Sequence, residues 1–331
     1  MNKHPTRQDF RLLHRLRVRW AEVDMQNIVF NAHYLMYMDV AITEYWRDSA
    51  MPFAQSFGLL GGDMVVRKAS VDFIQSARMD DVLDIGMRFV QAGRSSMLFQ
   101  GAVFRGHELL ATGELTYVYT TPDHHAKTSQ PVPQALRDAL AAYEAGEPMT
   151  QLHLLPWSAC QAQAMQLRHA VFAQEKSIPP ELMGDEADAT AVHVLVTNHL
   201  GLALATGRMV LPASLTTPSG SAAPTPGQLA GHARRTGQVG RMAVLHAQRS
   251  QGLGARMLHA LLQQARELGL DDVVLHAQLG AVDFYARHGF ERQGEVFEAA
   301  GLPHQTMVLS LTTAEWPATA THMDTGAGHG H

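Results

Sequence analysis

The sequence predicts an α+β protein built from two domains. The chain has 331 residues, which is more than one domain usually contains, and 46% of them are hydrophobic, enough for a core in each half. In the first half, strand-like segments surround one strongly apolar helix. In the second half, an apolar strand at 239–245 leads through a glycine-containing turn into a helix, and a further strand and helix follow.

The N-terminal half opens with a predicted strand over 12–20, followed by an irregular turn and a helix over 33–47. Apolar residues cover most of the circumference of this helix, which is typical of a helix enclosed by other elements. These residues are Tyr34, Leu35, Met36, Tyr37, Met38, Val40, Ala41, Ile42, Tyr45 and Trp46.

Four segments with strand character follow the helix, at 64–74, 82–91, 95–105 and 108–120. Short turns around Gly93 and Gly106 join the later ones, so the sheet is expected to be antiparallel. A helix over 134–144 then closes the domain. One long antiparallel sheet around one buried helix is the hotdog architecture.

Proline- and glycine-rich stretches place the domain borders. Gly146, Pro148 and Pro156 interrupt the periodic pattern, which predicts a first domain over 1–147 and a second over 148–312. Residues 211–237 are rich in Pro, Ser, Ala, Thr and Gly and are predicted to form a flexible insertion between two strands. Residues 313–331 are predicted to be a disordered tail.

Composition excludes several function classes. The formal net charge of -5 and the lack of a Lys/Arg stripe argue against nucleic-acid binding. The 19 histidines have no metal-ligand spacing, so no metal is expected. No apolar run is long enough for a membrane span, and we see no export signal. The single cysteine, Cys160, suits a reducing compartment, so a cytoplasmic location is expected.

The turn over 249–255 predicts a phosphate-binding site. Gly252 and Gly254 allow backbone N–H groups to approach a phosphate closely, and the N-terminus of the following helix favours negative charge. The dinucleotide and P-loop fingerprints are both absent, because the third glycine and the Gly-Lys-Ser/Thr sequence are missing. The expected ligand is the diphosphate of a CoA-type molecule. The helix has apolar residues at helical spacing, namely Leu253, Met257, Leu258, Leu261 and Leu262.

This segment resembles motif A of the GNAT N-acetyltransferases, Arg/Gln-x-x-Gly-x-Gly/Ala, and 284–290 resembles the Phe-Tyr-x-x-x-Gly-Phe motif of the same family. The resemblance implies a mixed sheet with flanking helices, acetyl-CoA as acyl donor and an amine acceptor of unknown identity. Tyr285 would protonate the departing thiolate, a task that suits a phenol; the alternative is a core aromatic. The implied acetyl-CoA contacts are Met242, Ala243 and Val244 on a splayed strand, and Arg249, Gln251, Gly252, Leu253, Gly254 and Ala255 in the turn.

The residues before the first helix resemble the Asp-x-x-Gly-x-Val-x-x-x-x-Tyr signature of the 4-hydroxybenzoyl-CoA thioesterase family, with Asp24, Val29 and Tyr34 matching. The resemblance implies that Asp24 attacks the thioester or activates water, and that the Asn31 N–H polarises the carbonyl group. A helix N-terminus stabilises developing negative charge there. The alternative for Asp24 is a turn or N-cap residue. Asn27 replaces the usual glycine and tolerates a left-handed backbone.

Other residues keep two interpretations each. Glu44 is either a second catalytic carboxylate or a solvated or interface residue, and His33 is either a substrate contact or a capping or packing residue. An acidic cluster either orients the acceptor amine or is a solvated loop; it consists of Glu175, Glu181, Asp185, Glu186 and Asp188. Pocket depth, and with it acyl preference, would depend on residues such as Phe53, Phe57 and Met64.

Together these patterns predict a bifunctional protein. One half would hydrolyse acyl- or aroyl-CoA to an acid and CoA, and the other would transfer acetyl groups from acetyl-CoA to an amine. The hotdog resemblance also implies a homodimer or homotetramer, because family sites lie at the dimer interface. Two alternatives stay open: the GNAT half senses acetyl-CoA without turnover, or the hotdog half serves only as a dimerisation platform.

Overall fold

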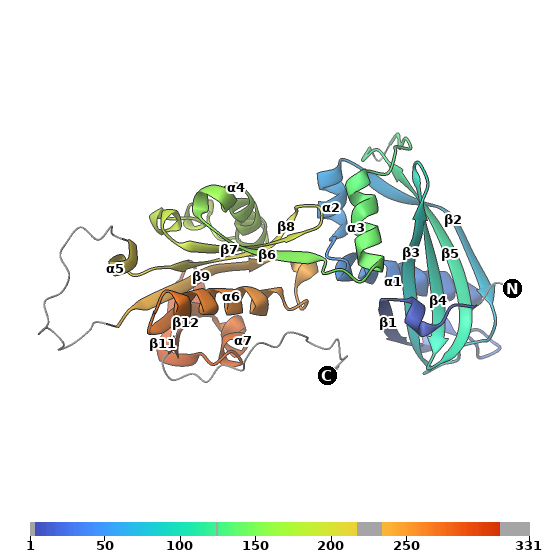
Figure 1. Cartoon of the computed structure of the whole chain (residues 1–331). Helices are drawn as coiled ribbons and strands as arrows, with labels where there is room; N and C mark the ends of the chain where they lie inside the picture. The colour runs from blue at the N-terminus through green and yellow to red at the C-terminus, as the bar shows by residue number, and fades with distance from the viewer. Residues whose placement is uncertain (1–3, 124, 217–233, 312–331) are drawn as a thin grey trace, which may run out of the picture. The chain divides into compact units, whose positions relative to one another are not determined.

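The computed structural model describes residues 4–123, 125–216 and 234–311 (Figure 1). The chain forms two compact units. Among the described residues, the first consists of those up to His153 together with Leu195–Thr206 and Ala243–Ala255, and the second of Leu154–Val194, 207–216, 234–242 and 256–311. The domain border at 147/148 stays a prediction. The tail at 313–331 and most of the insertion, 217–233, lie outside the described residues.

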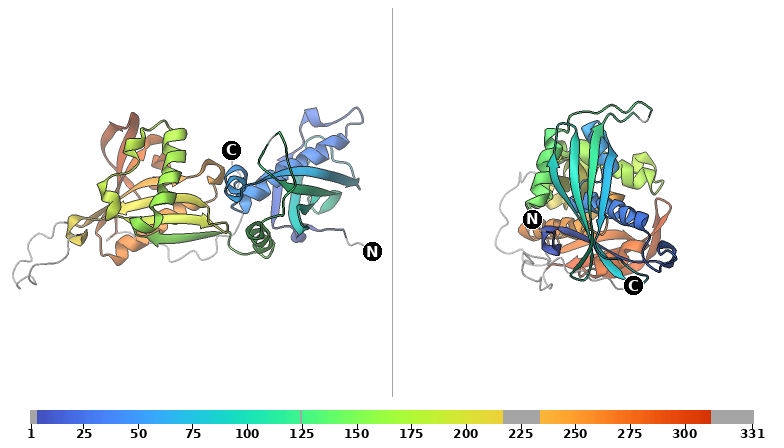
Figure 2. Two further views of the ribbon diagram at one scale, coloured as in Figure 1. Left: turned by 90° about the horizontal axis from the view of Figure 1, so that it is seen from above. Right: turned by 90° about the vertical axis from the view of Figure 1, so that its right-hand side faces the viewer.

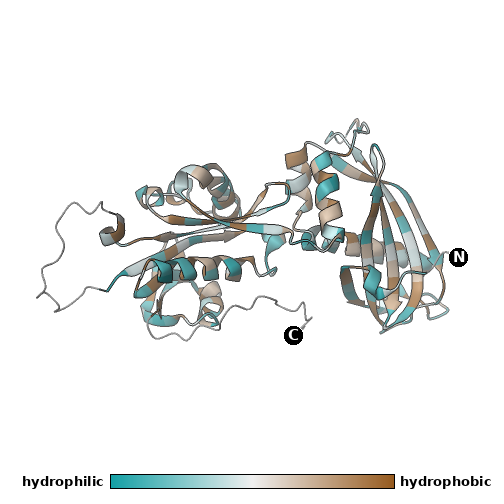
Figure 3. Cartoon of the chain, in the orientation of Figure 1, coloured by the Kyte–Doolittle hydropathy of each residue, from teal (hydrophilic) through white to brown (hydrophobic). Residues whose placement is uncertain are grey.

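A five-stranded antiparallel sheet dominates the N-terminal region, as the hairpin turns predict. Its order is β1-β3-β4-β5-β2. The Gly93 N–H donates to the Ser96 carbonyl at 2.8 Å, and Gly106 has the left-handed φ of 60° that its tight turn requires. Apolar and polar bands alternate along these strands in Figure 3. The strands are β1 (Leu12–Arg17), β2 (Asp63–Phe73), β3 (Val82–Ala92), β4 (Ser96–Arg105) and β5 (Glu108–Thr120).

Helix α1 (Asn31–Asp48) packs against this sheet (Figures 1 and 2). Small residues in the strands permit a close approach: a Cβ added to Gly113 would lie 2.5 Å from the Met38 sulfur. Most apolar residues of α1 are buried, but Leu35, Met36 and Val40 are 37%, 42% and 41% exposed. The expectation of a helix enclosed on all sides is therefore wrong for one side in the isolated chain. Helices α2 (Phe53–Leu60) and α3 (Gln134–Glu144) complete the region.

The first strand is shorter than the predicted 12–20. It ends at Arg17, and Trp20–Glu22 form a 3₁₀ turn, η2. The Glu22 carboxylate folds back and accepts a hydrogen bond from the Arg19 backbone N–H at 2.8 Å, which closes this turn and turns the chain away from the sheet.

The second sheet has seven strands in the order β11-β12-β10-β9-β8-β7-β6. Strands β9 and β10 are parallel, whereas β12 is antiparallel to both β10 and β11, so the sheet is mixed as expected. The strands are β6 (Thr150–Leu155), β7 (Val192–Asn198), β8 (Ala203–Val210), β9 (Thr236–Val244), β10 (Asp272–Gln278), β11 (Glu291–Ala299) and β12 (Leu302–Ser310).

Helices cover the seven-stranded sheet, with α4 above it and α6 below it in the view of Figure 1. The predicted apolar positions of α6 are all buried, from Leu253 to Leu262. Helix α4 continues into a π-helical turn, η3 (His169–Gln174). No helix within the described ranges is long and apolar enough to cross a membrane. The helices of this region are α4 (Trp157–Arg168), α5 (Ala213–Thr216), α6 (Leu253–Glu267) and α7 (Val282–Ala286). Its short 3₁₀ turns are η4 (Pro180–Leu182), η5 (Glu186–Ala189), η6 (His246–Gln248) and η7 (Leu279–Ala281), and the N-terminal region has a further one, η1 (Arg7–Asp9).

Strand β9 begins three residues before the predicted start at 239 and ends at Val244. The reason is its neighbour: Thr236–Val239 pair in parallel with Asp272–Leu275, so the last two residues of the predicted insertion, Thr236 and Gly237, belong to the sheet.

Candidate active sites

Asp24 lies in a tight hairpin that carries the chain from η2 into α1. Val23 pairs with Val29 across this hairpin. The Asp24 N–H donates to the Ile28 carbonyl at 2.9 Å, and the Asn27 N–H donates to the Asp24 carbonyl at 2.9 Å. Asn27 has a φ of 59°, the left-handed conformation that its side chain tolerates. The replacement of glycine at this position is therefore compatible with the turn.

The Asp24 side chain takes part in the same turn. Its Oδ1 accepts a hydrogen bond from the Gln26 N–H at 2.8 Å, the contact of an Asx turn. Its other oxygen has no partner among the described residues, and the side chain is half-buried. Asp24 thus makes the hydrogen bond expected of a turn residue through one carboxylate oxygen. Its second oxygen is available to react with a substrate.

Asn31 is the first residue of α1, where backbone amides have no acceptor inside the helix. The preceding amide is fixed, because the Phe30 N–H donates to the Glu22 carbonyl at 2.9 Å. The hairpin that carries Asp24 therefore also determines where α1 begins, and both predicted groups of the hydrolytic site belong to one hydrogen-bonded segment.

Glu22 is a buried carboxylate that the sequence analysis did not single out. Its side chain is 3% exposed and accepts hydrogen bonds from the Arg19 N–H and from the Tyr37 hydroxyl, both at 2.8 Å. Burial alone would raise the pKa of Glu22, but these hydrogen bonds and the Arg19 guanidinium outweigh burial and lower it. The sequence does contain a sign of this buried carboxylate, because Glu22 lies among the apolar residues Trp20, Ala21 and Val23, two residues before Asp24.

The secondary candidates of this region have local partners. His33 packs edge-on against Phe30 at 6.2 Å, and its Nδ1 is buried without a partner among the described residues. Glu44 pairs with Arg47, as a surface residue of α1 would. Phe57 is buried and packs on Phe53 at 4.4 Å between ring centroids. Met64 is half-buried in β2, and the influence of these residues on acyl preference stays a prediction.

Strands β9 and β10 separate beyond the pair Val239–Leu275, where their parallel pairing stops. Arg241 has a φ of 54° in β9, a conformation that breaks the regular strand. A cavity of about 500 Å³ lies where the strands part, and both line it, β9 through 238–242 and β10 through 275–278. Met242 lines this cavity, whereas Ala243 is buried and Val244 half-buried farther along β9.

Tyr285 reaches the same cavity from α7. Its ring packs on Phe284 at 5.0 Å and on Phe290 at 5.9 Å, so it is also part of an aromatic cluster. Burial raises the pKa of Tyr285 to about 12. The phenol is therefore protonated at neutral pH and remains a proton donor.

The turn before α6 has the backbone that its glycines predict. Ser250 and Gly252 have φ values of 64° and 74°, and α6 starts at Leu253. A Cβ added to Gly252 would meet nothing within 4 Å, so there is open space on that side of the turn. The Arg249 Nε donates to the Val244 carbonyl at 3.2 Å, which ties the turn to the end of β9. Gln251 is exposed, whereas Gly254 and Ala255 are half-buried in the first turn of α6.

Comparison with known proteins decides the family of the C-terminal region. The acetyltransferase (GNAT) domain family matches residues 220–311. The uncharacterized N-acetyltransferase YjcF of Bacillus subtilis is 30% identical over 146 residues, which cover 44% of this chain and 89% of that protein. This chain belongs to the GNAT acetyltransferases.

The N-terminal region of this GNAT protein is a hotdog thioesterase domain, because the thioesterase superfamily matches residues 26–112. A putative esterase of Aquifex aeolicus is 26% identical over 93 residues, 28% of this chain and 72% of that protein. A similar solved structure is Slr0204, a 1,4-dihydroxy-2-naphthoyl-CoA thioesterase from Synechocystis. It is 18% identical, with a TM-score of 0.35, and the match covers 39% of this chain and 95% of that one.

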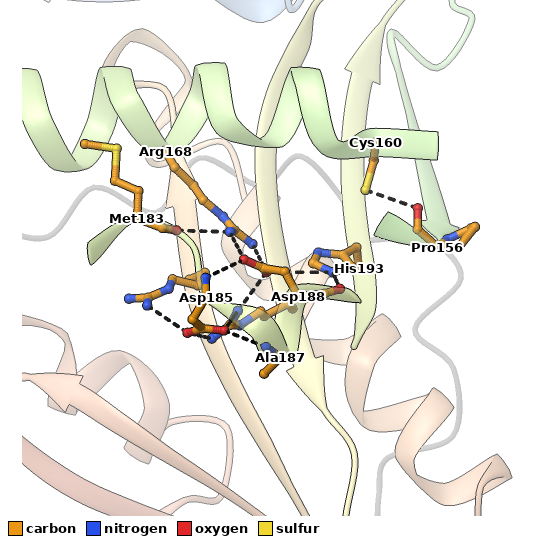
Figure 4. Close-up of polar contacts among 10 residues, drawn as sticks. Pro156, Cys160, Arg168, Met183, Asp185, Ala187, Asp188 and His193 are labelled. Atoms are coloured by element: carbon orange, nitrogen blue, oxygen red, sulfur yellow. Dashed lines mark hydrogen bonds and ion pairs between the residues drawn. The ribbon is translucent and has the colours of Figure 1, made fainter. Parts of the chain in front are cut away.

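The acidic cluster of the GNAT domain is largely exposed, as the solvated-loop interpretation predicts, and Asp188 is the exception. Asp188 is buried and accepts two hydrogen bonds of 2.9 Å from Arg168 (Figure 4). Asp185 accepts two of 2.6 Å from Arg208. Both carboxylates are paired with arginines, so neither is free to orient an amine. Asp188 is buried, whereas 42% of the Asp185 side chain is exposed. Sequence reasoning missed the arginines because they lie 20 or more residues away; the remaining acidic residues, Glu175, Glu181 and Glu186, are exposed.

Proposed function

We propose that this chain is a bifunctional enzyme, an acyl-CoA thioesterase joined to an acetyl-CoA-dependent N-acetyltransferase. The observation that carries the proposal is the cavity between the separated strands β9 and β10, with the protonated phenol of Tyr285 at its wall. An acyl thioester laid along β9 would bring its sulfur near that phenol. No metal is needed for either reaction.

In the transfer reaction, the acceptor amine attacks the acetyl carbonyl carbon, a C–N bond forms, and the C–S bond breaks. Tyr285 gives its proton to the departing CoA thiolate and regains one, through solvent, from the nitrogen that becomes positively charged when the neutral amine adds. The backbone N–H groups between Gln251 and Ala255 would hold the diphosphate at the N-terminus of α6, with Arg249 fixing the turn. Met242, Ala243 and Val244 would bind the pantetheine arm through their backbone.

In the hydrolytic reaction, the free oxygen of Asp24 attacks the thioester carbonyl carbon or removes a proton from an attacking water. The Asn31 N–H at the start of α1 stabilises the oxyanion that develops. When Asp24 attacks, the CoA thiolate leaves and water then hydrolyses the acyl-Asp24 anhydride; when Asp24 acts as a base, water attacks directly and the thiolate leaves. Either route gives the free acid and CoA, whose thiolate takes up the released proton. The Glu22 contacts hold the hairpin that carries both groups.

The hydrolytic site is proposed to be complete in a homodimer or homotetramer. Strand β2 lies at the edge of its sheet, and its region exposes Val66, Phe73 and Ile74 at 50%, 53% and 43%. A long edge strand with exposed apolar residues can pair with a second copy. Such pairing would also cover the uncovered side of α1. A cytoplasmic location is proposed from Cys160, a buried free thiol.

One observation favours the alternative in which the hotdog region only dimerises: an Asp24 oxygen is already used by the turn. Thiol release from a panel of acyl- and aroyl-CoAs decides between the two. We expect release that Asp24→Asn reduces about 100-fold or more. No release above background by wild type would leave the hotdog region with dimerisation alone, and an unchanged rate in Asp24→Asn would contradict the proposed role of Asp24.

The corresponding alternative for the GNAT region is a sensor that binds acetyl-CoA without turnover. Calorimetric titration with acetyl-CoA and a transfer assay with a broad amine panel separate the two functions. Binding with transfer supports the enzyme, whereas binding with no transfer to any amine, unaltered in Tyr285→Phe, supports the sensor.

A further inference from the structure

The cavity between β9 and β10 carries an excess of positive charge. Its charged lining residues are three cations, Lys176, Arg208 and Arg241, and one carboxylate, Asp185. An acceptor that is a bare ammonium would be repelled by this wall. The family motifs do not identify the acceptor. The positive charge of the wall therefore restricts which acceptors can bind.

The carboxylates beneath the wall do not cancel this excess. Asp188 is engaged by Arg168 and, at 2.7 Å, by Arg208. Asp185 already receives both guanidinium nitrogens of Arg208 at 2.6 Å. Three guanidiniums thus share two carboxylates, and Arg241 has the weakest share, a single contact of 3.1 Å to Asp185.

Arg241 is the cation with unused donors. It stands at the break in β9, and its side chain is 31% exposed. Its Nε is buried and has no partner within the described residues. Burial, and then the charge of Arg208, lower the pKa of Arg241. A guanidinium binds a planar or tetrahedral anion through two parallel N–H groups.

We propose that the acceptor is a primary amine that also carries an anionic group, and that Arg241 binds this group at the wall of the cavity. The proposal rests on the proposed acetyltransferase function. The anion would be held at the break in β9 while the amine end lies toward Tyr285, which lines the same cavity. Carboxylate and phosphate share this chemistry, and the test separates them.

Matched acceptors test the proposal by transfer. The pairs are 4-aminobutanoate with 4-aminobutanamide, and O-phosphoethanolamine with ethanolamine, each measured as kcat/KM with saturating acetyl-CoA. We expect the anionic member of one pair to be preferred by roughly 10- to 100-fold, the value of one or two charge-assisted hydrogen bonds. Arg241→Met should remove the preference, and Arg241→Lys, which keeps the charge, should retain part of it. Arg287→Met changes an exposed arginine that does not line the cavity and should leave the preference intact.

A binding measurement decides the question without turnover. The N-acetylated forms of the same four compounds are titrated into the full chain, and acetyl-CoA is titrated separately. The expected result is tighter binding of one anionic product, lost in Arg241→Met, with acetyl-CoA affinity unchanged. Equal binding of anionic and neutral products, or an Arg241→Met defect confined to acetyl-CoA, would overturn the proposal. If the proposal fails in this way but neutral amines are acetylated, the acetyltransferase function is still supported. If anionic products bind selectively but no amine is acetylated, the anion site is supported and the acetyltransferase function is not.

Discussion

The Tyr37 hydroxyl donates a hydrogen bond of 2.8 Å to the buried carboxylate of Glu22. This bond joins the middle of α1 to the segment just before the Asp24 hairpin. Since the Glu22 carbonyl also accepts from the Phe30 N–H, one residue connects η2, the hairpin and the first turn of the helix. The positions of Asp24 and the Asn31 N–H, the proposed hydrolytic groups, therefore depend on the Glu22 carboxylate, although neither group contacts it directly.

Tyr37→Phe should destabilise the chain by about 1.5–3 kcal/mol, because it removes a hydrogen bond to a buried charged group. Urea unfolding followed by tryptophan fluorescence measures this change. Tyr117→Phe is the matched control, since the Tyr117 hydroxyl is buried without a partner among the described residues. That variant should be neutral or slightly stabilising, and equal losses in the two variants would contradict the role of the Glu22 contact.

Asp188 should make the stability of the chain depend on acid pH. Burial alone would raise the pKa of Asp188, but the hydrogen bonds from Arg168 and Arg208 outweigh burial and lower it from 3.8 to about 2. A lowered carboxylate pKa contributes stability that is present above the unfolded-state value and is lost as pH falls through the folded-state value.

Stability on the order of 2 kcal/mol should therefore disappear between about pH 5 and pH 2. Urea unfolding at a series of pH values checks this. Asp188→Asn should be less stable at pH 6 and should show a flatter pH profile. Glu186→Gln, which changes an exposed carboxylate in the same turn, should keep the wild-type profile. A profile equally steep in Asp188→Asn would refute the assignment.

The exposed edge of β2 predicts self-association. Lysine at both Val66 and Ile74 places like charges along this edge, so the double variant should have the mass of a single chain in light scattering, whereas wild type has that of a dimer or tetramer. Val90→Lys is the control, because Val90 is 47% exposed and lies on β3, not on β2. A wild-type chain that is monomeric at micromolar concentration would contradict the prediction.

The raised pKa of Tyr285 predicts a pH profile for acetyl transfer. A phenol with a pKa of about 12 stays protonated through pH 10. The rate constant kcat should therefore not fall between pH 8 and pH 10 through loss of this proton, and Tyr285→Phe should lower kcat by about 100-fold or more. A fall in wild-type kcat centred below pH 10 that Tyr285→Phe abolishes would show that the phenol ionises earlier.

The elements that the sequence predicted well are those set by local chemistry. Helix α3 has the predicted bounds of 134–144, and β5 those of 108–120. The hairpin turns at Gly93 and Gly106 and the left-handed Asn27 follow from residue types at single positions. The apolar spacing of α6 identified its buried face for the same reason.

What the sequence could not supply depends on residues distant along the chain. The arginines that engage Asp185 and Asp188 come from α4, β8 and β9, and no local pattern pairs them. The early end of β1 depends on one side-chain contact of Glu22, which overrides the strand propensity of the residues that follow. The uncovered side of α1 is apolar in sequence, and periodicity alone assigns such a side to the core.

The central claim is that one chain carries two separate CoA-thioester chemistries. Thiol release from an acyl-CoA panel and acetyl transfer to the amine panel, both measured on wild type, Asp24→Asn and Tyr285→Phe, test it most directly. We predict that Asp24→Asn abolishes hydrolysis and keeps transfer, and that Tyr285→Phe abolishes transfer and keeps hydrolysis. Loss of both activities in either variant with the fold intact, or wild type lacking one of them, would contradict the account.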